Sequence, residues 1–551
     1  MNASVNRKTG LALVAGGLLS GCMGVLADSA GSQPNVLFIL ADDLGYGDVA
    51  CYGNPYVDTP VIDRLAQNGI RFIDYYTPSP LCAPARAALL TGRYNHRTGA
   101  IDVSSNRGID RIALSEKTFG DYFKSAGYTT ALIGKWHNGL YCNDYLPHKR
   151  GFDLFYGFAN GQQDYWNWNL NRNDVIEKHD GRYMTDVFNQ EAVAFIRQCA
   201  DQKKPFALFL AHHPPHPPYQ APQDLIDKYK ARLDGKYDEP VAIIYAMIER
   251  MDTGLGQVFQ TLEDCGIAQN TIIVFTSDNG AQLFGDQMRY HAGFQGNKGN
   301  VLEEGIRVPA IVSWPGVLPA GRVEATPVHG CDWLPTLFSL TGAPPPAGAK
   351  PLDGRNILPQ LRAGNFSETE DRALCFQKNR YTPVAHSDAA IRSGEWKLYW
   401  PGEKTTMEKD IGRDNPSFMR GTAMLPWEMP IDPDLPNFGK IQTLPPKLFD
   451  LETDPGEKTD LAAAHPEMVQ QLARAYDAWF SDVSKDWKKS NHEIIEHDEQ
   501  YWARRKIPDP AVLFKDFWQW KHSPGTNPET DDPLEVFTGY WNYKEKRQAI
   551  P

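Results

Sequence analysis

The apolar run Asn35-Val36-Leu37-Phe38-Ile39-Leu40 leads through Ala41 to the acidic pair Asp42-Asp43. Its apolar residues do not alternate with polar ones, which is typical of a strand buried on both faces of a parallel sheet. Three further runs of this kind are Thr129–Ile133, Phe206–Leu210 and Thr271–Phe275. Helical stretches lie between the runs, so the sequence predicts an α/β fold with a large, mostly parallel sheet sandwiched by helices.

The four runs all stop at residues that bind metals or move protons. These residues are Asp42, Asp43, Lys135, His137, His212, His213, His216, Asp278 and Asn279. Because the carboxyl ends of parallel strands meet at one edge of a sheet, where ligands collect, we expect these side chains to form one site.

A metal site is predicted at this edge from the oxygen donors alone. Asp42, Asp43, Asp278 and Asn279 offer only carboxylate and amide oxygens. Oxygen ligands favour a hard ion, Ca²⁺ or Mg²⁺, over zinc. A helix-capping role would explain one of the adjacent aspartates but hardly both, since neighbouring carboxylates repel unless a cation holds them.

Cys82 is expected at the start of a helix. Pro84 suits the first turn of a helix, and Ala85–Leu90 is strongly helix-forming. The free N–H groups and the dipole at such a helix start attract an anion. On these residues alone, the alternative is that Cys82 is a buried structural thiol or a redox cysteine with a lowered pKa.

Several motifs together resemble the type I, formylglycine-dependent sulfatases of the alkaline phosphatase-like superfamily. They are Cys82-Ala83-Pro84-Ala85-Arg86 with Thr91-Gly92-Arg93, Asp42–Asp48, Gly134–Gly139, Pro214–Tyr219, Ser277–Gly280, Gly296–Gly299, Glu303–Pro309, Asp332–Thr336 and Leu448–Glu457. The resemblance covers roughly residues 34 to 480.

This resemblance implies a site and its cofactors. A formylglycine-generating enzyme would oxidise Cys82 to formylglycine (3-oxoalanine), the nucleophile. Ca²⁺ would be held by Asp42, Asp43, Asp278 and Asn279, with residue 82 completing the shell. The remaining catalytic residues would be Arg86, Lys135, His137, His216 and Lys298. His137 would take the proton that releases sulfate, and His216 or Lys298 would assist the leaving group.

The amino-terminal segment predicts export. Arg7 and Lys8 precede the short apolar run Leu11–Leu19, which is too short to span a membrane. Leu19-Ser20-Gly21-Cys22 looks like a bacterial lipobox, in which Cys22 would be lipidated, while a cut after Ala27 would give an unanchored protein. Either reading places the protein in the periplasm, on the outer membrane or outside the cell.

Composition limits the partners. The net charge is -12, so the chain has no general attraction for nucleic acid or an anionic membrane. An anionic substrate would therefore need locally clustered cations. Six cysteines besides Cys22 and Cys82 are scattered without metal-type pairs, and both disulfides and free thiols remain open for them.

The sequence divides into three parts. Residues 1–27 form the signal peptide, residues 32–375 the catalytic domain, and residues 376–551 a smaller α+β subdomain with a short antiparallel sheet and a Trp-rich tail. We expect a helix over Pro466–Phe480. The loop 161–172 alternates aromatic and amide residues, which suits either contact with a sugar or simple packing.

The function we expect is hydrolysis of a sulfate ester on a sulfated carbohydrate. The nearest alternative is a phosphonate monoester or phosphodiester hydrolase of the same superfamily. A third reading, a catalytically silent glycan-binding homologue, is disfavoured because no motif residue is missing.

Overall fold

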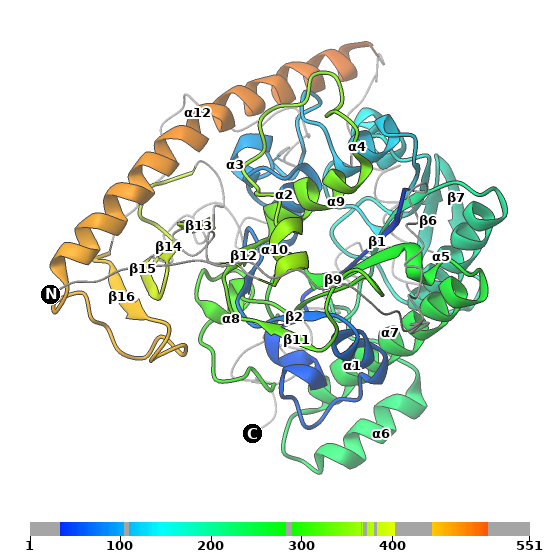
Figure 1. Cartoon of the computed structure of the whole chain (residues 1–551), viewed down its shortest axis with the longest axis horizontal. Helices are drawn as coiled ribbons and strands as arrows, with labels where there is room; N and C mark the ends of the chain where they lie inside the picture. Colours follow the sequence, from blue (N-terminus) through cyan, green and yellow to red (C-terminus); the bar gives the residue numbers. More distant parts are fainter. Residues whose placement is uncertain are drawn as a thin grey trace, which may run out of the picture. The chain divides into compact units, whose positions relative to one another are not determined.

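A ten-stranded sheet forms the centre of the molecule (Figure 1). A computed structural model describes residues 33–103, 109–140, 142–282, 289–364, 366, 372–378, 383–402 and 444–504. The strands follow the order β11 (Arg322–Glu324), β2 (Ile70–Phe72), β10 (Ala310–Ser313), β9 (Thr271–Ser277), β1 (Asn35–Ala41), β8 (Phe206–Ala211), β4 (Thr129–Lys135), β5 (Leu154–Phe158), β6 (Asn169–Arg172) and β7 (Val175–Lys178). The four strands predicted from apolar runs are β1, β4, β8 and β9.

The predicted strands are neighbours and run parallel. In register, Val36 of β1 pairs with Ala207 of β8 and with Ile272 of β9, and Thr130 of β4 pairs with Ala207. Antiparallel strands occur only toward the two sides, where β10 pairs with β9 and β2, and β6 pairs with β5 and β7. The prediction of a large, mostly parallel sheet is therefore confirmed.

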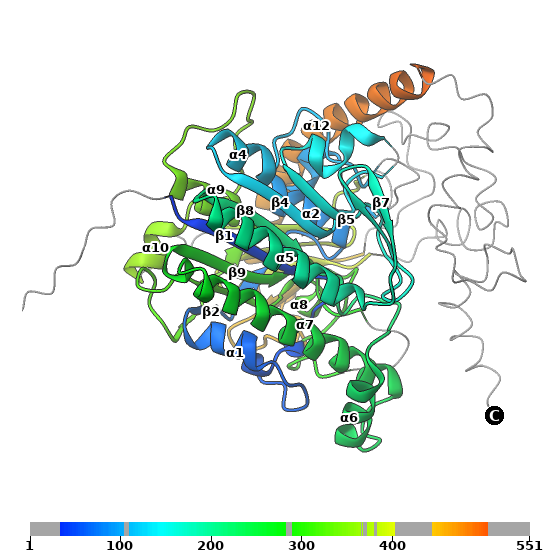
Figure 2. The ribbon, with the colours of Figure 1, turned by 90° about the vertical axis from the view of Figure 1, so that its right-hand side faces the viewer.

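Helices cover both faces of the sheet. Successive side chains of a strand point to opposite faces, so each face presents apolar residues that a layer of helices buries. Leu37 and Ile39 of β1 belong to one core, and Val36, Phe38 and Leu40 belong to the other. The first core contains α1 (Pro60–Gln67), α5 (Met184–Asp201), α6 (Gln223–Leu233) and α7 (Glu239–Asp264). The second contains α2 (Cys82–Thr91), α4 (Phe119–Ser125), α9 (Trp333–Phe338) and α10 (Leu358–Ala363). Figure 2 shows α5 and α7 lying across their face of the sheet.

The C-terminal part contains the predicted second sheet. It is antiparallel throughout, with strands β13 (Leu374–Gln377), β14 (Ala389–Ser393), β15 (Trp396–Trp400) and β16 (Lys447–Asp450). Phe376 and Ala390 of this sheet share a core with Tyr76, Val301 and Ile306 of the catalytic part. The boundary at residue 375 stays a prediction.

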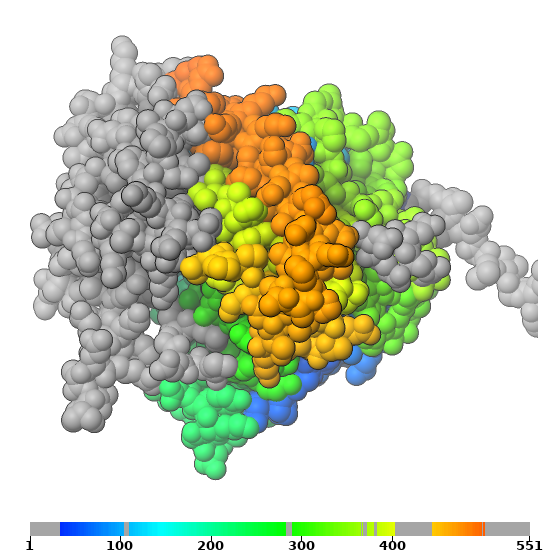
Figure 3. Space-filling view, turned by 90° about the vertical axis from the view of Figure 1, so that its left-hand side faces the viewer, coloured from blue at the N-terminus to red at the C-terminus, as the bar shows by residue number. Residues whose placement is uncertain are grey.

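The last described helix, α12 (Pro466–Arg504), is much longer than expected. Figure 3 shows it running diagonally across the surface. Its first half packs on the second sheet through Leu472 and Tyr476, and Trp487 in its second half is buried against Ile101 and Ile109. The expected helix over Pro466–Phe480 is correct in its start and wrong in its end.

The described residues also bear on the state of the cysteines and on membrane-spanning helices. The seven described cysteines (Cys51, Cys82, Cys142, Cys199, Cys265, Cys331 and Cys375) are free thiols and form no disulfide with one another. None of the described helices has the length and apolarity needed to cross a membrane. The signal segment with Cys22, most of residues 401–446 and the end of the Trp-rich tail lie outside the described residues.

A buried ion triad joins the second sheet to α8 (Glu303–Ile306), the short helix that follows the Lys298 loop. Lys397 Nζ lies 2.8 Å from Glu303 Oε1 and 2.8 Å from Glu457 Oε1, and all three side chains are buried. Glu457 Oε2 also accepts a 2.7 Å hydrogen bond from the backbone N–H of Glu303. The triad thus anchors the end of this loop to the second sheet.

Lys397→Met is therefore expected to lower the free energy of unfolding by about 3 kcal/mol, because the buried carboxylate of Glu457 would lose its cation and Glu303 would keep only Arg307, at 3.2 Å. Lys124→Met is the matched control, since Lys124 is half-exposed and pairs with Asp153 at 2.7 Å. Its cost should be below about 1 kcal/mol. Urea unfolding of both variants measures the difference, and equal costs would show that the triad contributes no special stability.

Candidate active site

The carboxyl ends of β9, β1, β8 and β4 bring the predicted site residues together. Lys135 Nζ, at the end of β4, lies 2.7 Å from Asp42 Oδ2, which follows β1. Asp278, which follows β9, accepts a 3.2 Å hydrogen bond from the backbone N–H of Asp43. His213, which follows β8, lies 3.0 Å from Asp42 Oδ2. Residues far apart in sequence thus contact one another because their strands are parallel neighbours.

Cys82 is the first residue of α2, and its side chain is buried. Its Sγ lies 3.2 Å from His137 Nδ1. Burial raises the pKa of the Cys82 thiol, although the charges of Lys135 and Lys298 oppose that rise. The residue is therefore a neutral thiol at neutral pH, which argues against a redox cysteine activated by a lowered pKa.

His137 presents a nitrogen lone pair to residue 82. Its Nε2 lies 3.3 Å from the carbonyl oxygen of Val103 and donates to it, which leaves Nδ1 as the acceptor facing Cys82. Burial, with the charges of Lys135 and Arg86, lowers the pKa of His137 well below its ordinary value. The backbone at His137 has a positive φ of 58°, a conformation that is uncommon outside glycine. His137 is thus a neutral base aimed at residue 82.

Arg86 links α2, the helix that begins at Cys82, to the carboxylates of Asp278 and Asp42. Its Nε donates to Asp278 Oδ2 at 2.8 Å, and its Nη1 donates to the carbonyl oxygen of Lys135 at 2.9 Å. Its Nη2 lies 3.8 Å from Asp42 Oδ2. The guanidinium therefore fixes α2 against the ends of β9, β1 and β4.

The residues of the predicted metal site fit a cation. Asp42 Oδ1, Asp43 Oδ2 and Asn279 Oδ1 are buried and have no hydrogen-bond partner among the described residues. Asp42, Asp43 and Asp278 each place a carboxylate oxygen within 4.8 Å of the others. Three unpaired oxygens that all belong to the predicted ligands are explained by a hard cation, since a buried unpaired oxygen costs free energy.

Charge balance in the site supports the same conclusion. The carboxylates of Asp42, Asp43 and Asp278 face the cationic groups of Arg86, Lys135 and Lys298. Burial would raise the pKa of Asp42, but the charges of Lys135 and Arg86 hold it well below its ordinary value. Burial and the charge of Asp42 instead raise the pKa of Asp278. Because three carboxylates are matched by three fixed cations, a bound metal ion would give the site a net positive charge, which attracts an anionic ester to a chain of net charge -12.

His216 and Lys298 both lie beside the carboxylate of Asp43. Lys298 Nζ lies 2.7 Å from Asp43 Oδ1, and His216 Nε2 lies 3.8 Å from Asp43 Oδ2. Burial alone would lower the pKa of Lys298, but Asp43 raises it above its ordinary value, so the ammonium stays charged. Burial lowers the pKa of His216, which is therefore neutral in the free site. An anion bound beside His216 would raise that pKa again.

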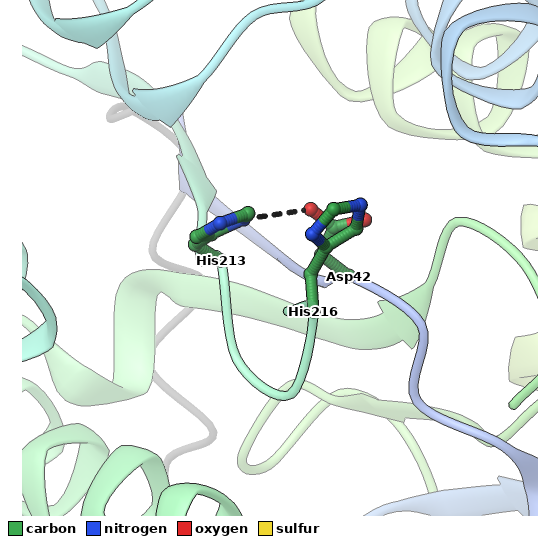
Figure 4. A group of neighbouring side chains, drawn as sticks. All are labelled: Asp42, His213 and His216. Carbon is green, nitrogen blue, oxygen red and sulfur yellow. Dashed lines mark hydrogen bonds and ion pairs between the residues drawn. The ribbon is translucent and has the colours of Figure 1, made fainter. Parts of the chain in front are cut away.

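His213, which was expected at this strand edge without a role of its own, lies beside Asp42 and His216 (Figure 4). His213 Nε2 accepts from the backbone N–H of Gln163 at 3.4 Å, so Nδ1 donates to Asp42 Oδ2. The His213 ring stacks on His216 at 4.7 Å and on Tyr165 at 5.0 Å. The Tyr165 hydroxyl donates to the carbonyl oxygen of His216 at 2.9 Å. His213 and Tyr165 therefore position His216 and Asp42.

The aromatic loop 161–172 thus packs against the site. Tyr165 and Trp168 are buried, and Trp166 is half-buried. Gly161 faces the ring of His137 so closely that a Cβ atom there would lie 2.7 Å from His137 Cε1. The described contacts favour the packing alternative for these rings over stacking on a sugar.

A buried ion pair between Arg289 and Asp48 lies behind Asp43 and was not predicted from the sequence. Arg289 donates to both carboxylate oxygens of Asp48 (2.7 and 2.6 Å) and to the carbonyl oxygen of Asp43 (2.9 Å). Asp48 belongs to a motif noted in the sequence, but Arg289 lies in a segment without periodicity. This buried ion pair supports the backbone of Asp43, which itself adopts a positive φ of 64°.

A family model described as Sulfatase matches residues 34–343. The chain belongs to the sulfatase family. It is 30% identical over 488 residues to N-acetylgalactosamine-6-sulfatase of Canis lupus familiaris, covering 83% of this chain and 87% of that protein. It is also 30% identical over 571 residues to steryl-sulfatase of Rattus norvegicus, covering 86% and 94%. The protein is thus a sulfuric ester hydrolase, as predicted.

A solved structure of Ps i-CgsB in complex with k-i-k-neocarrahexaose has the same fold. Its TM-score is 0.68 at 28% identity, and the match covers 88% of this sulfatase and 100% of that chain. The alkaline phosphatase-like architecture of a sulfatase is therefore shown, and the site described above occupies the strand ends where such folds bind ligands.

Proposed function

We propose that this sulfatase hydrolyses a sulfate ester of a carbohydrate through formylglycine made from Cys82, with Ca²⁺ held by Asp42, Asp43, Asp278 and Asn279. The observation that carries the proposal is the meeting of residue 82, a neutral base and three unpaired ligand oxygens at one sheet edge. Formylglycine supplies a hydrated aldehyde oxygen as nucleophile, and Ca²⁺ supplies positive charge beside it.

The chain's own residues bind the anion and move the protons. The N-terminus of α2, Lys135 and Lys298 direct N–H groups and positive charge at the site, where they stabilise a sulfuryl group as its charge develops. His137 Nδ1 accepts a proton at residue 82, because its lone pair already faces that position. Arg86 keeps α2 and Asp278 in fixed relation throughout.

His216→Ala is expected to slow poor leaving groups most. With an alkyl or sugar sulfate the departing oxygen needs a proton, and losing a general acid costs about 10²–10⁴-fold in rate. With nitrophenyl sulfate the leaving group is stable without a proton, so the loss should be far smaller. His148→Ala, at a histidine paired with Asp174, is the control. An equal loss on both substrates would show that His216 does not protonate the leaving group.

The carbohydrate proposal rests on two observations. The relatives named above include a structure with a bound oligosaccharide and a 6-sulfatase of an amino sugar. The described residues expose few large hydrophobic side chains: Val175, Ile176, Val317 and Val323, none of which belongs to the site. A sterol would need a broad apolar surface, so the described part of the chain favours a sugar over a steroid sulfate.

Parallel kinetics test the reaction class. The purified protein should release nitrophenol from nitrophenyl sulfate with a much larger kcat/KM than from a nitrophenyl phosphodiester or phosphonate monoester. A dominant phosphodiesterase or phosphonate rate would favour the alternative hydrolase. Binding of sulfated saccharides without turnover, in protein with confirmed formylglycine, would favour the glycan-binding reading. Sulfate release from defined sulfated saccharides would then identify the sugar and position.

Export and maturation complete the proposal. The charged and apolar start of the chain supports export to the periplasm or beyond, and the lipobox supports a lipid anchor at Cys22. Because Cys82 is buried in the folded protein, the maturing enzyme would act before folding is complete. Incorporation of labelled palmitate into the wild type and not into Cys22→Ala would establish the anchor, and equal labelling would exclude it.

A further inference from the structure

A second group of metal-ligating side chains lies where α12 meets the segment that follows Gly139. Cys142, His497 and Asp498 place a sulfur, a ring nitrogen and a carboxylate oxygen within 4.8 Å of one another. Cys142 Sγ lies 3.5 Å from Asp498 Oδ1, and His497 Nδ1 lies 3.4 Å from the same oxygen. None of the three residues belongs to the sulfatase site.

We propose that Cys142, His497 and Asp498 bind a zinc ion. A tetrahedral zinc with bonds of about 2.3 Å to sulfur and about 2.0 Å to nitrogen and oxygen separates its sulfur and oxygen ligands by about 3.5 Å, and its nitrogen and oxygen ligands by about 3.3 Å. The observed sulfur–oxygen separation of 3.5 Å and nitrogen–oxygen separation of 3.4 Å match these two values. Mixed sulfur and nitrogen ligation also distinguishes this group from the oxygen-only catalytic site and suits zinc.

The orientation of His497 supports a cation between its ring and Asp498. His497 Nε2 lies 3.1 Å from Asp144 Oδ2, an outer carboxylate of the kind that orients metal-bound imidazoles. With Nε2–H donated to Asp144, Nδ1 carries a lone pair. That lone pair and Asp498 Oδ1 would face each other as two acceptors, which is unfavourable unless a metal ion or a proton lies between them.

The charged groups around Cys142, His497 and Asp498 also favour an added cation. Arg111 pairs with Asp498 through Oδ2, which leaves Oδ1 to the cluster. Asp110 lies near enough to act on the same guanidinium, and Asp144 adds a third carboxylate. Asp498 and Asp110 thus act on Arg111, Asp144 faces His497, and Arg150 is a second cation near Tyr145. The hydroxyl of Tyr145, which is buried beside Cys142 and Asp498, has no hydrogen-bond partner among the described residues.

A zinc ion here would have a structural role. It would tie the second half of α12 to the segment that begins five residues after His137, adding to the packing of Trp487. The competing reading of the same geometry is an imidazolium held between Asp144 and Asp498 with no metal ion. With zinc, the positive charge is on the metal ion, His497 is a neutral ligand and Cys142 is a thiolate; without it, the charge is on the His497 ring and Cys142 stays a thiol.

Cobalt titration separates these readings. The full chain in a Cys82→Ala background, stripped with a chelator, is titrated with Co²⁺ and then with Zn²⁺. We expect one equivalent of Co²⁺ to give a thiolate-to-metal charge-transfer absorbance that one equivalent of Zn²⁺ removes. The catalytic site, with oxygen ligands only, cannot give this band.

Two variants and one control assign the band. Cys142→Ser should abolish it, and His497→Gln should weaken Zn²⁺ binding at least about tenfold. Cys199→Ala, at another buried cysteine, should keep both signals, and circular dichroism checks that all chains are folded. Absence of the charge-transfer band in the Cys82→Ala chain, or its persistence in Cys142→Ser, would overturn the proposal and leave the imidazolium reading.

Discussion

Replacing Cys82 with alanine is expected to abolish sulfate release while leaving the protein folded. Cys82 Sγ lies 3.2 Å from His137 Nδ1, and alanine offers no atom that attacks sulfur. Removing a catalytic nucleophile costs about 10⁴-fold or more in kcat. Alanine suits the start of α2, so the helix should form as before.

The matched control for this loss is Cys199→Ala. Cys199 is a buried free thiol on α5, outside the site, so its removal takes away the same atoms without touching the reaction. We expect Cys199→Ala to retain nearly full activity. If Cys82→Ala also kept substantial activity in a thermally stable protein, residue 82 could not be the nucleophile and the proposed mechanism would be wrong.

Asp278→Ala should have a comparable effect by removing both the metal ion and the activity. The carboxylate of Asp278 is buried, lies within 4.8 Å of the oxygens of Asp42 and Asp43, and binds Arg86. Without it the ion loses a ligand and the guanidinium of Arg86 loses its closest counter-charge. We expect a fall in turnover of about 10³-fold or more, since both the metal charge and the position of α2 depend on this residue.

Elemental analysis separates loss of the ion from loss of the fold. The wild type should carry one Ca²⁺ per chain after gel filtration in calcium-free buffer, and Asp278→Ala should carry none. Asp252→Asn is the control, because Asp252 is a buried aspartate that accepts hydrogen bonds from the N–H groups of Val61 and Ile62 at the start of α1. Full calcium content in Asp278→Ala would exclude Asp278 as a ligand.

The centre of the fold could be predicted because its strands are buried on both faces. Each of the four apolar runs became a central strand, and the polar residues that ended them met at one edge. The outer strands could not be predicted in the same way. β2, β10 and β11 have three or four residues each, too few for a run to stand out from loop sequence.

The true length of α12 did leave a signal in the sequence. Val483, Trp487, Asn491, Ile494 and Tyr501 are all buried, at spacings of mostly three or four residues that form one helical stripe. The many charged residues between them concealed this stripe. Several of these charges pair with the catalytic part, as Asp486 does with Arg97 at 2.7 Å.

The supporting residues of the site were the least predictable. His213 was expected at the strand edge but without a role of its own, and neither Tyr165 nor Arg289 was given a site role. Their contacts with His216 and with Asp43 join segments that are far apart in the sequence, and no local sequence pattern predicts such contacts. Motif residues identify which groups do the chemistry, whereas the groups that hold them in place depend on tertiary packing.

Mass spectrometry of the tryptic peptide Phe72–Arg86 from an active preparation tests the central claim most directly. Conversion of the Cys82 thiol to formylglycine exchanges sulfur for oxygen with loss of two hydrogens, which makes the peptide about 18 Da lighter. We predict that the lighter peptide is present and that its fraction rises in proportion to specific activity across preparations. Full activity in protein whose peptide carries only unmodified cysteine would contradict it.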